Sequence, residues 1–298
     1  MRILITGATG MLGSYLIKYF RKQYEVYATG RTKCEFLGVP YMPFDLSEGD
    51  YRLLIDWSKP DLIIHSGALT NGNYCQNNPE ETFKVNALSV QKLIEETEDK
   101  VKIIYISTDA VFPASLSKAK EKDIVNPENI YGKSKELGEF YLRNSYNRKY
   151  SILRTTIVGL NSLKGRKSFV EWIIKSSINN QTFSLFKDVF FSPISIWSLA
   201  NEISFLILND IFENEILHIA GESITKYEFG LKLLNTLELQ KNTLNETSIL
   251  SFDSRANRST DQTLDSSYYR EKYNRQLPNV MDTIGLIKKH YEQNKIRL

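Results

Sequence analysis

Residues 2–13 read Arg2-Ile3-Leu4-Ile5-Thr6-Gly7-Ala8-Thr9-Gly10-Met11-Leu12-Gly13, a short apolar run followed by a glycine-rich turn. The run is typical of a buried strand over Arg2–Thr6, and the pattern after the turn predicts a helix from about Met11 to Lys22. Glycines at this junction let the chain turn sharply, approach an anion closely and pack the helix on a sheet. The N–H groups at the helix start then face a phosphate. A helix-start turn without a ligand is the alternative interpretation.

The same alternation of apolar runs and helical patterns continues to about residue 160. Further strands are predicted at Glu25–Ala28, just before Asp45, and at Asp61–His65, Lys102–Ser107 and Tyr150–Arg154, with helices at Pro79–Glu98 and Tyr131–Asn144. Nearly continuous apolar strands separated by helices indicate a parallel sheet covered on both faces. We therefore predict an α/β fold: a Rossmann-like doubly wound parallel sheet with a smaller C-terminal lobe.

Composition narrows the class of protein. The 298 residues are 42% hydrophobic and 24% charged, which is ordinary for a globular chain. A net charge of +3 from 38 basic and 35 acidic residues is too balanced for a nucleic-acid-binding protein. Cys34 and Cys75 form no disulfide framework, and with the three scattered histidines they give no metal-ligand spacing. No signal peptide and no membrane span is evident, so we expect a cytoplasmic protein.

The end of the second predicted strand indicates which dinucleotide is bound. An acidic residue there bonds the ribose 2′-hydroxyl of NAD, but this chain has Thr29-Gly30-Arg31-Thr32-Lys33 instead. No carboxylate repels a 2′-phosphate, and the planar guanidinium of Arg31 suits one. NADP(H) is therefore favoured over NAD(H), with a solvated loop containing Arg31 and Lys33 as the alternative. Asp45, after the third strand, is a candidate for the adenine edge, which the spacing alone leaves open.

Tyr131 and Lys135 are four residues apart at a predicted helix start, so they share one face. A phenol has an ordinary pKa near ~10, and a neighbouring ammonium lowers that pKa by stabilising the phenolate. Tyr131 can then protonate a carbonyl oxygen while hydride reaches the carbon. An exposed helix face is the alternative.

Ser107-Thr108-Asp109 ends the strand at Lys102–Ser107, where a ligand crevice of an open α/β sheet lies. A hydroxyl there can polarise a substrate carbonyl, although a helix cap or a turn uses the same residue types. The glycine turn, this strand end and the Tyr131/Lys135 pair follow one another along the chain, each at a strand end or a helix start. This order favours an oxidoreductase.

With these elements the chain resembles the extended short-chain dehydrogenases/reductases. The stretches that carry the resemblance are Gly7–Gly13, Asp45, His65-Ser66-Gly67-Ala68, Asn86, Ser107-Thr108-Asp109 and Tyr131/Lys135. Within that family it is most similar to the dTDP-4-dehydrorhamnose reductases and related nucleotide-sugar 4-ketoreductases. This second likeness rests on Ala68-Leu69-Thr70-Asn71, Val85-Asn86-Ala87 and Pro127-x-Asn129-x-Tyr131-Gly132-Lys133-Ser134-Lys135.

The resemblance implies a role for each matched residue. Tyr131 is the expected proton donor, Lys135 its pKa modifier and ribose ligand, Thr108 the polarising hydroxyl, and Asn86 holds the site geometry or a water relay. The expected cofactor ligands, besides Tyr131 and Lys135, are Gly7, Thr9, Gly10, Met11, Leu12, Gly13, Arg31, Asp45, Leu46, Ser66, Gly67, Ala68 and Ser107. The expected substrate contacts are Thr108, Asp109, Ala110, Tyr131, Ile157, Arg255 and Arg258.

Departures from the family pattern bear on the substrate. Sugar-nucleotide 4,6-dehydratases carry Thr-Asp-Glu where this chain has Thr108-Asp109-Ala110, so elimination lacks its base. Dehydrorhamnose reductases carry a tyrosine at the place of Ala110 and a tryptophan at that of Ile157, which suggests a different or differently oriented sugar.

Beyond residue 160 the alternation loosens, with helical patterns at Ser168–Asn179, Ile196–Leu208 and Lys226–Leu237. We expect residues 1–160 to bind the dinucleotide and residues 161–298 to form mainly a substrate-binding lobe, with later strands and helices free to pack back on the first part. The candidates for phosphate or base contacts there are Lys164-Gly165-Arg166-Lys167, Arg255 and Arg258, Phe183, Phe186 and Phe190-Phe191. Solvated loops and core aromatics are the alternatives.

The resemblance therefore implies NADPH-dependent reduction of the 4-keto group of a nucleotide-activated deoxysugar in surface-polysaccharide synthesis. The expected partner is a nucleotide-diphosphate sugar, not a nucleic acid or a membrane, and a homodimer is possible. One alternative is a sugar epimerase with tightly bound NAD(P). Another is a non-catalytic NADP-binding subunit, since the β regulatory subunit of methionine adenosyltransferase resembles these reductases. The intact Tyr131, Lys135 and Thr108 argue against the second.

Overall fold

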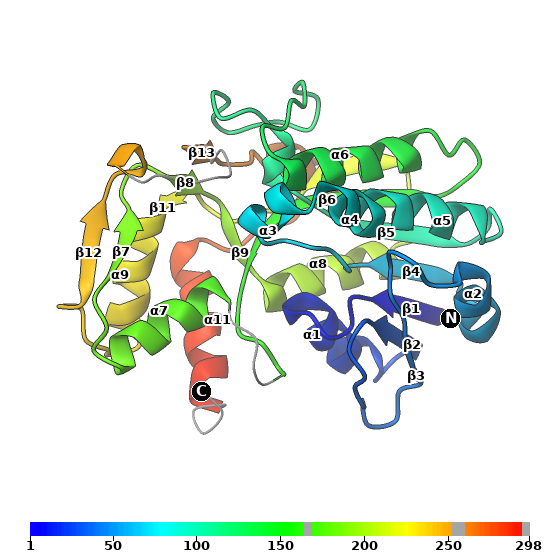
Figure 1. Ribbon diagram of the computed structural model, residues 1–298, viewed down its shortest axis with the longest axis horizontal. Helices are drawn as coiled ribbons and strands as arrows, with labels where there is room; N and C mark the ends of the chain where they lie inside the picture. The colour runs from blue at the N-terminus through cyan, green and yellow to red at the C-terminus, as the bar shows by residue number, and fades with distance from the viewer. Residues whose placement is uncertain (164–167, 252–259, 294–298) are drawn as a thin grey trace.

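An eight-stranded sheet organises the computed structural model, which describes residues 1–163, 168–251 and 260–293 (Figure 1). The strand order is β10-β6-β5-β4-β1-β2-β3, and β9 pairs with the far end of β6. Every pairing in this sheet is parallel, so the doubly wound parallel sheet is confirmed. The strands are β1 (Arg2–Thr6), β2 (Glu25–Gly30), β3 (Tyr41–Pro43), β4 (Leu62–His65), β5 (Lys102–Thr108), β6 (Tyr150–Val158), β9 (Pro193–Ser195) and β10 (Glu215–His218).

Helices cover both faces of the sheet (Figure 1). On one face α1 (Met11–Phe20) packs against α8 (Ile196–Leu208), and on the other α5 (Ser89–Glu95) packs against α6 (Ile130–Arg143). Side chains alternate along β1, so Ile3 and Ile5 enter one apolar core and Leu4 enters the other. The short helix α2 (Tyr51–Ser58) leads into β4. The order of strands changes direction between β1 and β4, which is where such a sheet binds ligands.

The predicted continuous helix over Pro79–Glu98 is wrong in one respect, because it contains a π-helical turn. Helix α4 (Pro79–Phe83) runs into a π-helix, η1 (Lys84–Leu88), before α5 begins. The extra residue per turn rotates Asn86 into the protein interior, where it is fully buried. Hydrophobic periodicity does not show this turn, which accompanies hydrogen bonds between the Asn86 side chain and the backbone of Leu69, 17 residues away. A short helix α3 (Gly72–Asn77) precedes α4.

The second half of the chain returns to the main sheet and also builds a smaller lobe. β9 and β10 join the main sheet, and α8 covers it. The smaller lobe holds two minor sheets, β7–β12 and β11–β8–β13, packed with three helices. Its elements are α7 (Phe169–Ile178), β7 (Phe183–Phe186), β8 (Phe190–Phe191), β11 (Ile224–Thr225), α9 (Lys226–Thr236), β12 (Leu244–Thr247), η3 (Ile249–Ser251), β13 (Asp261–Gln262) and α11 (Val280–Gln293). The division of binding roles between residues 1–160 and 161–298 stays a prediction.

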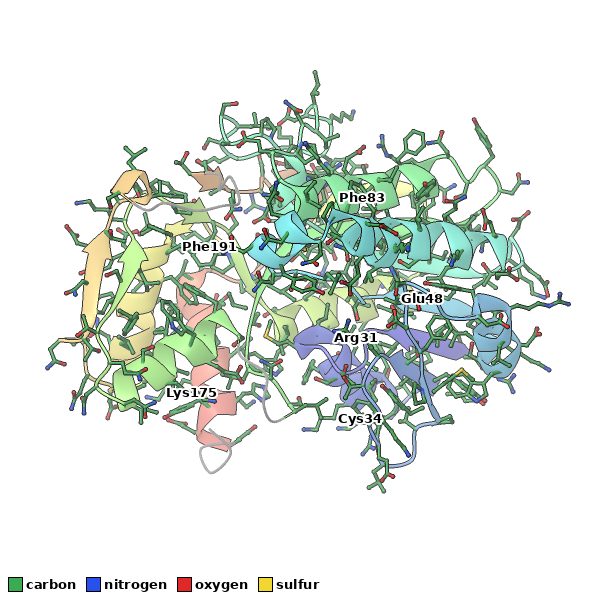
Figure 2. The ribbon with its side chains drawn as sticks, in the orientation of Figure 1. Arg31, Cys34, Glu48, Phe83, Lys175 and Phe191 are labelled. Atoms are coloured by element: carbon green, nitrogen blue, oxygen red, sulfur yellow. The ribbon has the colours of Figure 1, made fainter. Side chains whose placement is uncertain are left out.

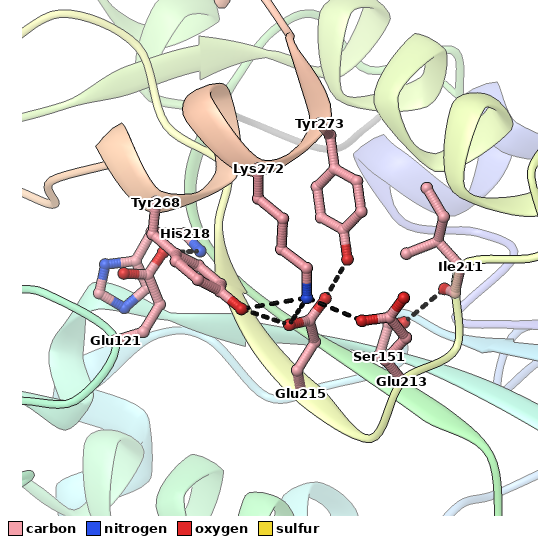
Figure 3. A network of polar contacts seen from close by, with 9 residues as sticks. All are labelled: Glu121, Ser151, Ile211, Glu213, Glu215, His218, Tyr268, Lys272 and Tyr273. Carbon is pink, nitrogen blue, oxygen red and sulfur yellow. Dashed lines mark hydrogen bonds and ion pairs between the residues drawn. The ribbon is translucent and has the colours of Figure 1, made fainter.

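Helix α10 (Ser267–Tyr273) is fastened to the edge strand β10 by a polar network (Figure 3). The Lys272 ammonium lies 2.7 Å from a carboxylate oxygen of Glu213 and 2.8 Å from one of Glu215. Tyr268 and Tyr273 donate to the two oxygens of Glu215. These contacts anchor α10 to the edge of the main sheet.

Candidate active site

Two adjoining cavities open at the carboxyl ends of the central strands. The first, which we call the loop cavity, is lined by these predicted residues: Gly7, Thr9, Gly10, Arg31, Asp45, Leu46, Ser66, Gly67 and Ala68. The second, which we call the tyrosine cleft, has a volume of about 700 Å³, within the range typical of ligand sites. Besides Gly10, Ser66 and Ala68, its predicted residues are Met11, Leu12, Gly13, Ser107, Thr108, Asp109, Tyr131, Lys135 and Ile157. The fold therefore brings both predicted sets into one continuous hollow.

The glycine turn between β1 and α1 fits a pyrophosphate. Gly7 has φ +68°, and a Cβ atom there would lie 2.6 Å from the backbone of Gly67. A Cβ on Gly13 would lie 2.3 Å from the carbonyl oxygen of Gly7. Helix α1 begins directly after Gly10, which offers no side chain to cap the first N–H groups. These groups face the cavities and suit an anion.

The predicted 2′-phosphate ligand Arg31 directly follows β2 (Figure 2). Its side chain is 65% exposed. It lines the loop cavity, but its Nη1 lies 3.5 Å from Oε1 of Glu81 on α4. Tyr74 donates to the other oxygen of Glu81 at 2.6 Å. Nothing in the sequence points to this carboxylate, because α4 follows a different strand and only the tertiary fold brings it near Arg31.

Asp45 also lines the loop cavity, as expected of a residue at the adenine edge. One of its oxygens accepts hydrogen bonds from the backbone N–H and the hydroxyl of Ser47, at 2.8 and 2.6 Å. These bonds, with a smaller contribution from Arg31, hold the pKa of the Asp45 carboxyl below its ordinary value. Asp45 therefore places a charged carboxylate in the wall of the loop cavity, and its contact with adenine stays a prediction.

Two of the predicted cofactor ligands use their hydroxyls inside the protein. Ser66 donates to the carbonyl oxygen of Thr6 at 2.7 Å, and Ser107 donates to Oε1 of Glu139 at 2.5 Å. Glu139 in turn forms a buried two-pronged pair with Arg154, at 2.9 and 2.6 Å. Both serines line the cavities. Because their hydroxyls are already hydrogen-bonded inside the protein, only their backbone atoms can contact a ligand unless the side chains rearrange.

Tyr131, Thr108 and Asp109 meet at the end of β5. The Thr108 hydroxyl donates to Oδ1 of Asp109 at 2.8 Å, and Thr156 donates to the other oxygen. Burial raises the pKa of the Asp109 carboxyl, although these hydrogen bonds partly offset the effect. Thr156 lines the tyrosine cleft and was missed, since nothing in Arg154-Thr155-Thr156 marks one threonine as facing Asp109.

Burial is the largest cause of the pKa shifts of both acid–base groups, Tyr131 and Lys135. It raises the pKa of the Tyr131 phenol well above its ordinary value, and contact with the Thr108 hydroxyl offsets only part of this. Burial lowers the pKa of Lys135 to about 7, despite the opposing charge of Glu139. The predicted lowering of the Tyr131 pKa by Lys135 stays a prediction, because burial sets the direction here and Lys135 is not among the groups that shift this pKa. A raised pKa keeps the phenol protonated at neutral pH, which is the form that donates.

Helix α6 reaches the cleft because glycines allow a close approach. Asn129 caps its start by accepting the Gly132 N–H at 2.9 Å. A Cβ on Gly132 would lie 2.1 Å from the carbonyl oxygen of Ala110, and one on Gly138 would lie 2.4 Å from the Tyr105 hydroxyl. Tyr131 directly precedes Gly132, Lys135 lies between the two glycines, and both side chains line the cleft.

Asn86 stands behind the cleft and lines neither cavity. Its amide accepts the Leu69 N–H at 2.7 Å and donates to the Leu69 carbonyl and to the Ser134 hydroxyl, both at 2.9 Å. It therefore joins the segment after β4 to helix α6. The geometry-holding role that the resemblance implied matches these contacts, and direct catalysis by Asn86 stays a prediction.

The expected substrate contacts divide into three groups. Ile157 and Asp109 line the tyrosine cleft, whereas Ala110 lines neither cavity and its carbonyl packs against Gly132. Arg255, Arg258 and the cluster at 164–167 lie outside the described residues.

A third cavity adjoins the tyrosine cleft at Phe169, and we call it the aromatic cavity. It has a volume of about 650 Å³ and is lined by Phe169, Trp172, Phe183, Phe186 and Lys226 among others. Phe191, by contrast, is buried (Figure 2). The Lys226 ammonium lies 3.4 Å from the centre of the Phe191 ring and near enough to Asp109 to lower that carboxyl's pKa. Lys226 was missed, since Thr225 and Glu228 mark only a helix start.

Neither a metal-binding cluster nor a membrane-spanning helix is present within the described ranges. No group of three or more histidine, cysteine, aspartate or glutamate side chains within those ranges can hold a metal ion. Within the same ranges, no helix has both the length and the apolar character to cross a bilayer.

Comparisons with known proteins show similarity over most of the chain. The family model described as RmlD substrate binding domain matches residues 1–292. The chain is 28% identical over 249 residues to dTDP-4-dehydrorhamnose reductase of Aggregatibacter actinomycetemcomitans, covering 80% of each chain. It is 27% identical over 249 residues to methionine adenosyltransferase 2 subunit beta of Xenopus tropicalis, covering 80% of this chain and 72% of that one. A crystal structure of dTDP-4-dehydrorhamnose reductase from Bacillus anthracis in complex with NADP superimposes with a TM-score of 0.86 at 23% identity, covering 97% and 99% of the two chains.

Proposed function

The chain belongs to the family of the RmlD substrate binding domain, and from this premise we propose that it reduces the 4-keto group of a nucleotide-activated deoxysugar with NADPH. One observation carries the proposal: Tyr131, Lys135 and Thr108 meet in the tyrosine cleft, which adjoins the loop cavity at Gly10, Ser66 and Ala68. The named reductases among the relatives support the reaction type, and the NADP bound to the Bacillus anthracis protein supports the cofactor.

The residues of the cleft divide the chemistry among them. The reduced nicotinamide supplies a hydride when NADPH is bound. Tyr131 delivers the proton to the carbonyl oxygen, which leaves an alcohol on the sugar and a tyrosinate that takes a new proton from solvent. Thr108 turns its hydroxyl proton from Asp109 toward the carbonyl oxygen and polarises it. Lys135, when charged, stabilises the tyrosinate. The turn from Gly7 to Gly13 and Arg31 hold the phosphates of the cofactor.

The substrate's nucleotide half is assigned to the aromatic cavity, because this cavity leads away from the reacting groups at Phe169. Trp172, Phe183 and Phe186 offer faces for a base, and Lys226 offers a cation for the diphosphate. Ile157 gives the sugar a smaller wall than an indole would, so the preferred sugar differs from that of enzymes with tryptophan there.

The test is NADPH oxidation by the purified protein with dTDP-, UDP-, GDP- and CDP-linked 4-keto-6-deoxysugars. We expect turnover with one of them, and Tyr131→Phe abolishes this turnover while NADPH binding stays within about twofold. Tightly retained NAD with no net NADPH oxidation would instead identify an epimerase. Full cellular function of Tyr131→Phe would identify a non-catalytic subunit, as the similarity to the methionine adenosyltransferase subunit allows. Cytoplasmic location and a homodimer belong to the same proposal, tested by cell fractionation and light scattering.

A further inference from the structure

Lys135 places its ammonium on an aromatic ring that none of the proposed chemistry uses. The side chain is 2% exposed, and its Nζ lies 3.9 Å from the centre of the Tyr105 ring. Tyr105 comes from β5, three residues before Thr108, and is fully buried. The attraction between a cation and the face of an aromatic ring grows when water is excluded, as it is here.

The other charged or titratable groups around Lys135 do not replace the ring. Glu139 lies one helical turn along α6, but Arg154 and Ser107 occupy its carboxylate. His65 comes from β4, and burial together with Lys135 lowers its pKa to about 3, so it is neutral. Tyr131 and Asp109 line the same cleft as Lys135, and burial raises the pKa of each. Across the described ranges no carboxylate pairs with the Lys135 ammonium within 4.0 Å.

Tyr105 is held so that its ring keeps this position. Its hydroxyl donates to the carbonyl oxygen of Asn86 at 3.0 Å and lies 3.4 Å from that of Lys135. Its ring stacks on the His65 ring, with centres 5.7 Å apart and planes inclined by 15°. Gly138 leaves room for the hydroxyl, since a Cβ there would lie 2.4 Å from it. Tyr105 thus joins β4, β5, the π-helical turn and α6 directly beneath the cleft.

We propose that Tyr105 is a positioning residue of this site, whose ring face favours the charged form of Lys135 and centres its ammonium at the floor of the tyrosine cleft. Burial alone makes the charged form of Lys135 costly, and its pKa of about 7 leaves that form only partly populated at neutral pH. The ring supplies attraction where no paired carboxylate does. The function of Lys135 here rests on the proposed reductase activity, but its contact with Tyr105 can be tested without turnover.

The direct test measures the pKa of the Lys135 ammonium by NMR of ¹⁵N-lysine-labelled full-length protein, with Lys135→Met to assign the signal. Tyr105→Phe keeps the ring and should leave this pKa within a few tenths of a unit. Tyr105→Leu removes the ring and should lower it by about one unit. Fluorinated phenylalanines at position 105 keep the shape of the ring while weakening its negative face, so the pKa should fall stepwise with fluorine number even if Tyr105→Leu does not fold. A pKa that does not respond to fluorination overturns the proposal.

The second readout is the pH profile of kcat/KM, which reports groups of the free enzyme. If charged Lys135 is required, activity falls above its pKa, and Tyr105→Leu moves this basic limb about one unit lower while Tyr105→Phe leaves it in place. An unshifted limb in Tyr105→Leu contradicts the role of the ring in turnover. A responsive Lys135 signal in a protein that reduces no sugar contradicts the proposed function and leaves the Tyr105 contact standing.

Discussion

Gly13 shows how a single side-chain atom decides whether the glycine turn can form. A Cβ there would lie 2.3 Å from the Gly7 carbonyl oxygen and 2.8 Å from its carbon, both backbone atoms that cannot move aside cheaply. We expect Gly13→Ala to weaken NADPH binding at least about tenfold, since a displaced α1 no longer presents its N–H groups. Fluorescence titration with NADPH measures the effect.

The matched control is Gly285→Ala in the exposed part of α11, where a Cβ would meet nothing within 4 Å. This variant should be more stable by about 0.5–1 kcal/mol and bind NADPH normally. Equal NADPH affinity in both variants would mean that the glycine turn does not approach the cofactor.

Glu81 is a competitor for the cation that is expected to hold the 2′-phosphate. Its carboxylate lies 3.5 Å from Arg31 and is fixed by Tyr74. A phosphate arriving at Arg31 therefore meets a like charge, and at about 4 Å such a repulsion is about 1 kcal/mol in water. Glu81→Gln should tighten binding of 2′,5′-ADP about three- to fivefold and leave 5′-ADP within about twofold. Calorimetry with the two nucleotides gives the ratio.

Glu80→Gln is the control for this prediction, because Glu80 is adjacent and pairs with Lys84 instead. It should change neither affinity. A Glu81→Gln variant that binds both nucleotides alike would show that Arg31 does not read the 2′-phosphate.

At the scale of elements, the π-helical turn η1 carries Asn86, whose amide hydrogen-bonds to Leu69 and Ser134. Asn86→Leu keeps the approximate shape but leaves the Leu69 N–H and carbonyl without their partners. We expect a loss of about 2 kcal/mol or more in the free energy of unfolding, measured by urea denaturation.

Ser134→Ala serves for comparison, because it removes only one of the Asn86 contacts and should lose about 1 kcal/mol. If the two variants are equally stable, the amide is not what holds the π-helical turn against the segment after β4.

At the scale of the whole molecule, the buried neutral histidines His65 and His218 make the free energy of unfolding depend on pH. Burial lowers the pKa of His65 and of His218 to about 3. Between that value and the ordinary value near ~6.5, the unfolded chain binds more protons than the folded one. The free energy of unfolding therefore falls as pH drops from about 6.5 to 3, by about 1.4 kcal/mol for each unit of pKa shift.

His218 tests this directly, since its ring nitrogen Nδ1 meets the Ala119 carbonyl at 3.0 Å and an asparagine amide can replace that donor. His218→Asn should be less stable at pH 7 but lose less stability on acidification than the natural protein. Denaturation curves at several pH values give the two slopes, and parallel slopes would show that His218 is not kept neutral by the fold.

Features carried by neighbouring residues could be predicted from the sequence. The strand, glycine turn and helix over residues 2–20 are confirmed almost to the residue, because alternation and glycine placement act within a few positions. The four-residue spacing of Tyr131 and Lys135 likewise fixed their common face, and the strand end at Thr108 placed it in the crevice. The parallel order of the sheet followed from the same local pattern.

What the sequence could not determine depends on segments far apart in the chain. No spacing in the sequence marks the contact of Glu81 with Arg31 or that of Tyr105 with Lys135, because each joins two different elements. The same holds for the electrostatic effect of Lys226 on Asp109. The rise of the Tyr131 pKa on burial could not be predicted for the same reason, since desolvation is set by everything packed around the phenol. Local sequence determined which groups the protein carries to its cleft, and tertiary packing alone decided their partners and charges, because burial and long-range contact are properties of the folded chain.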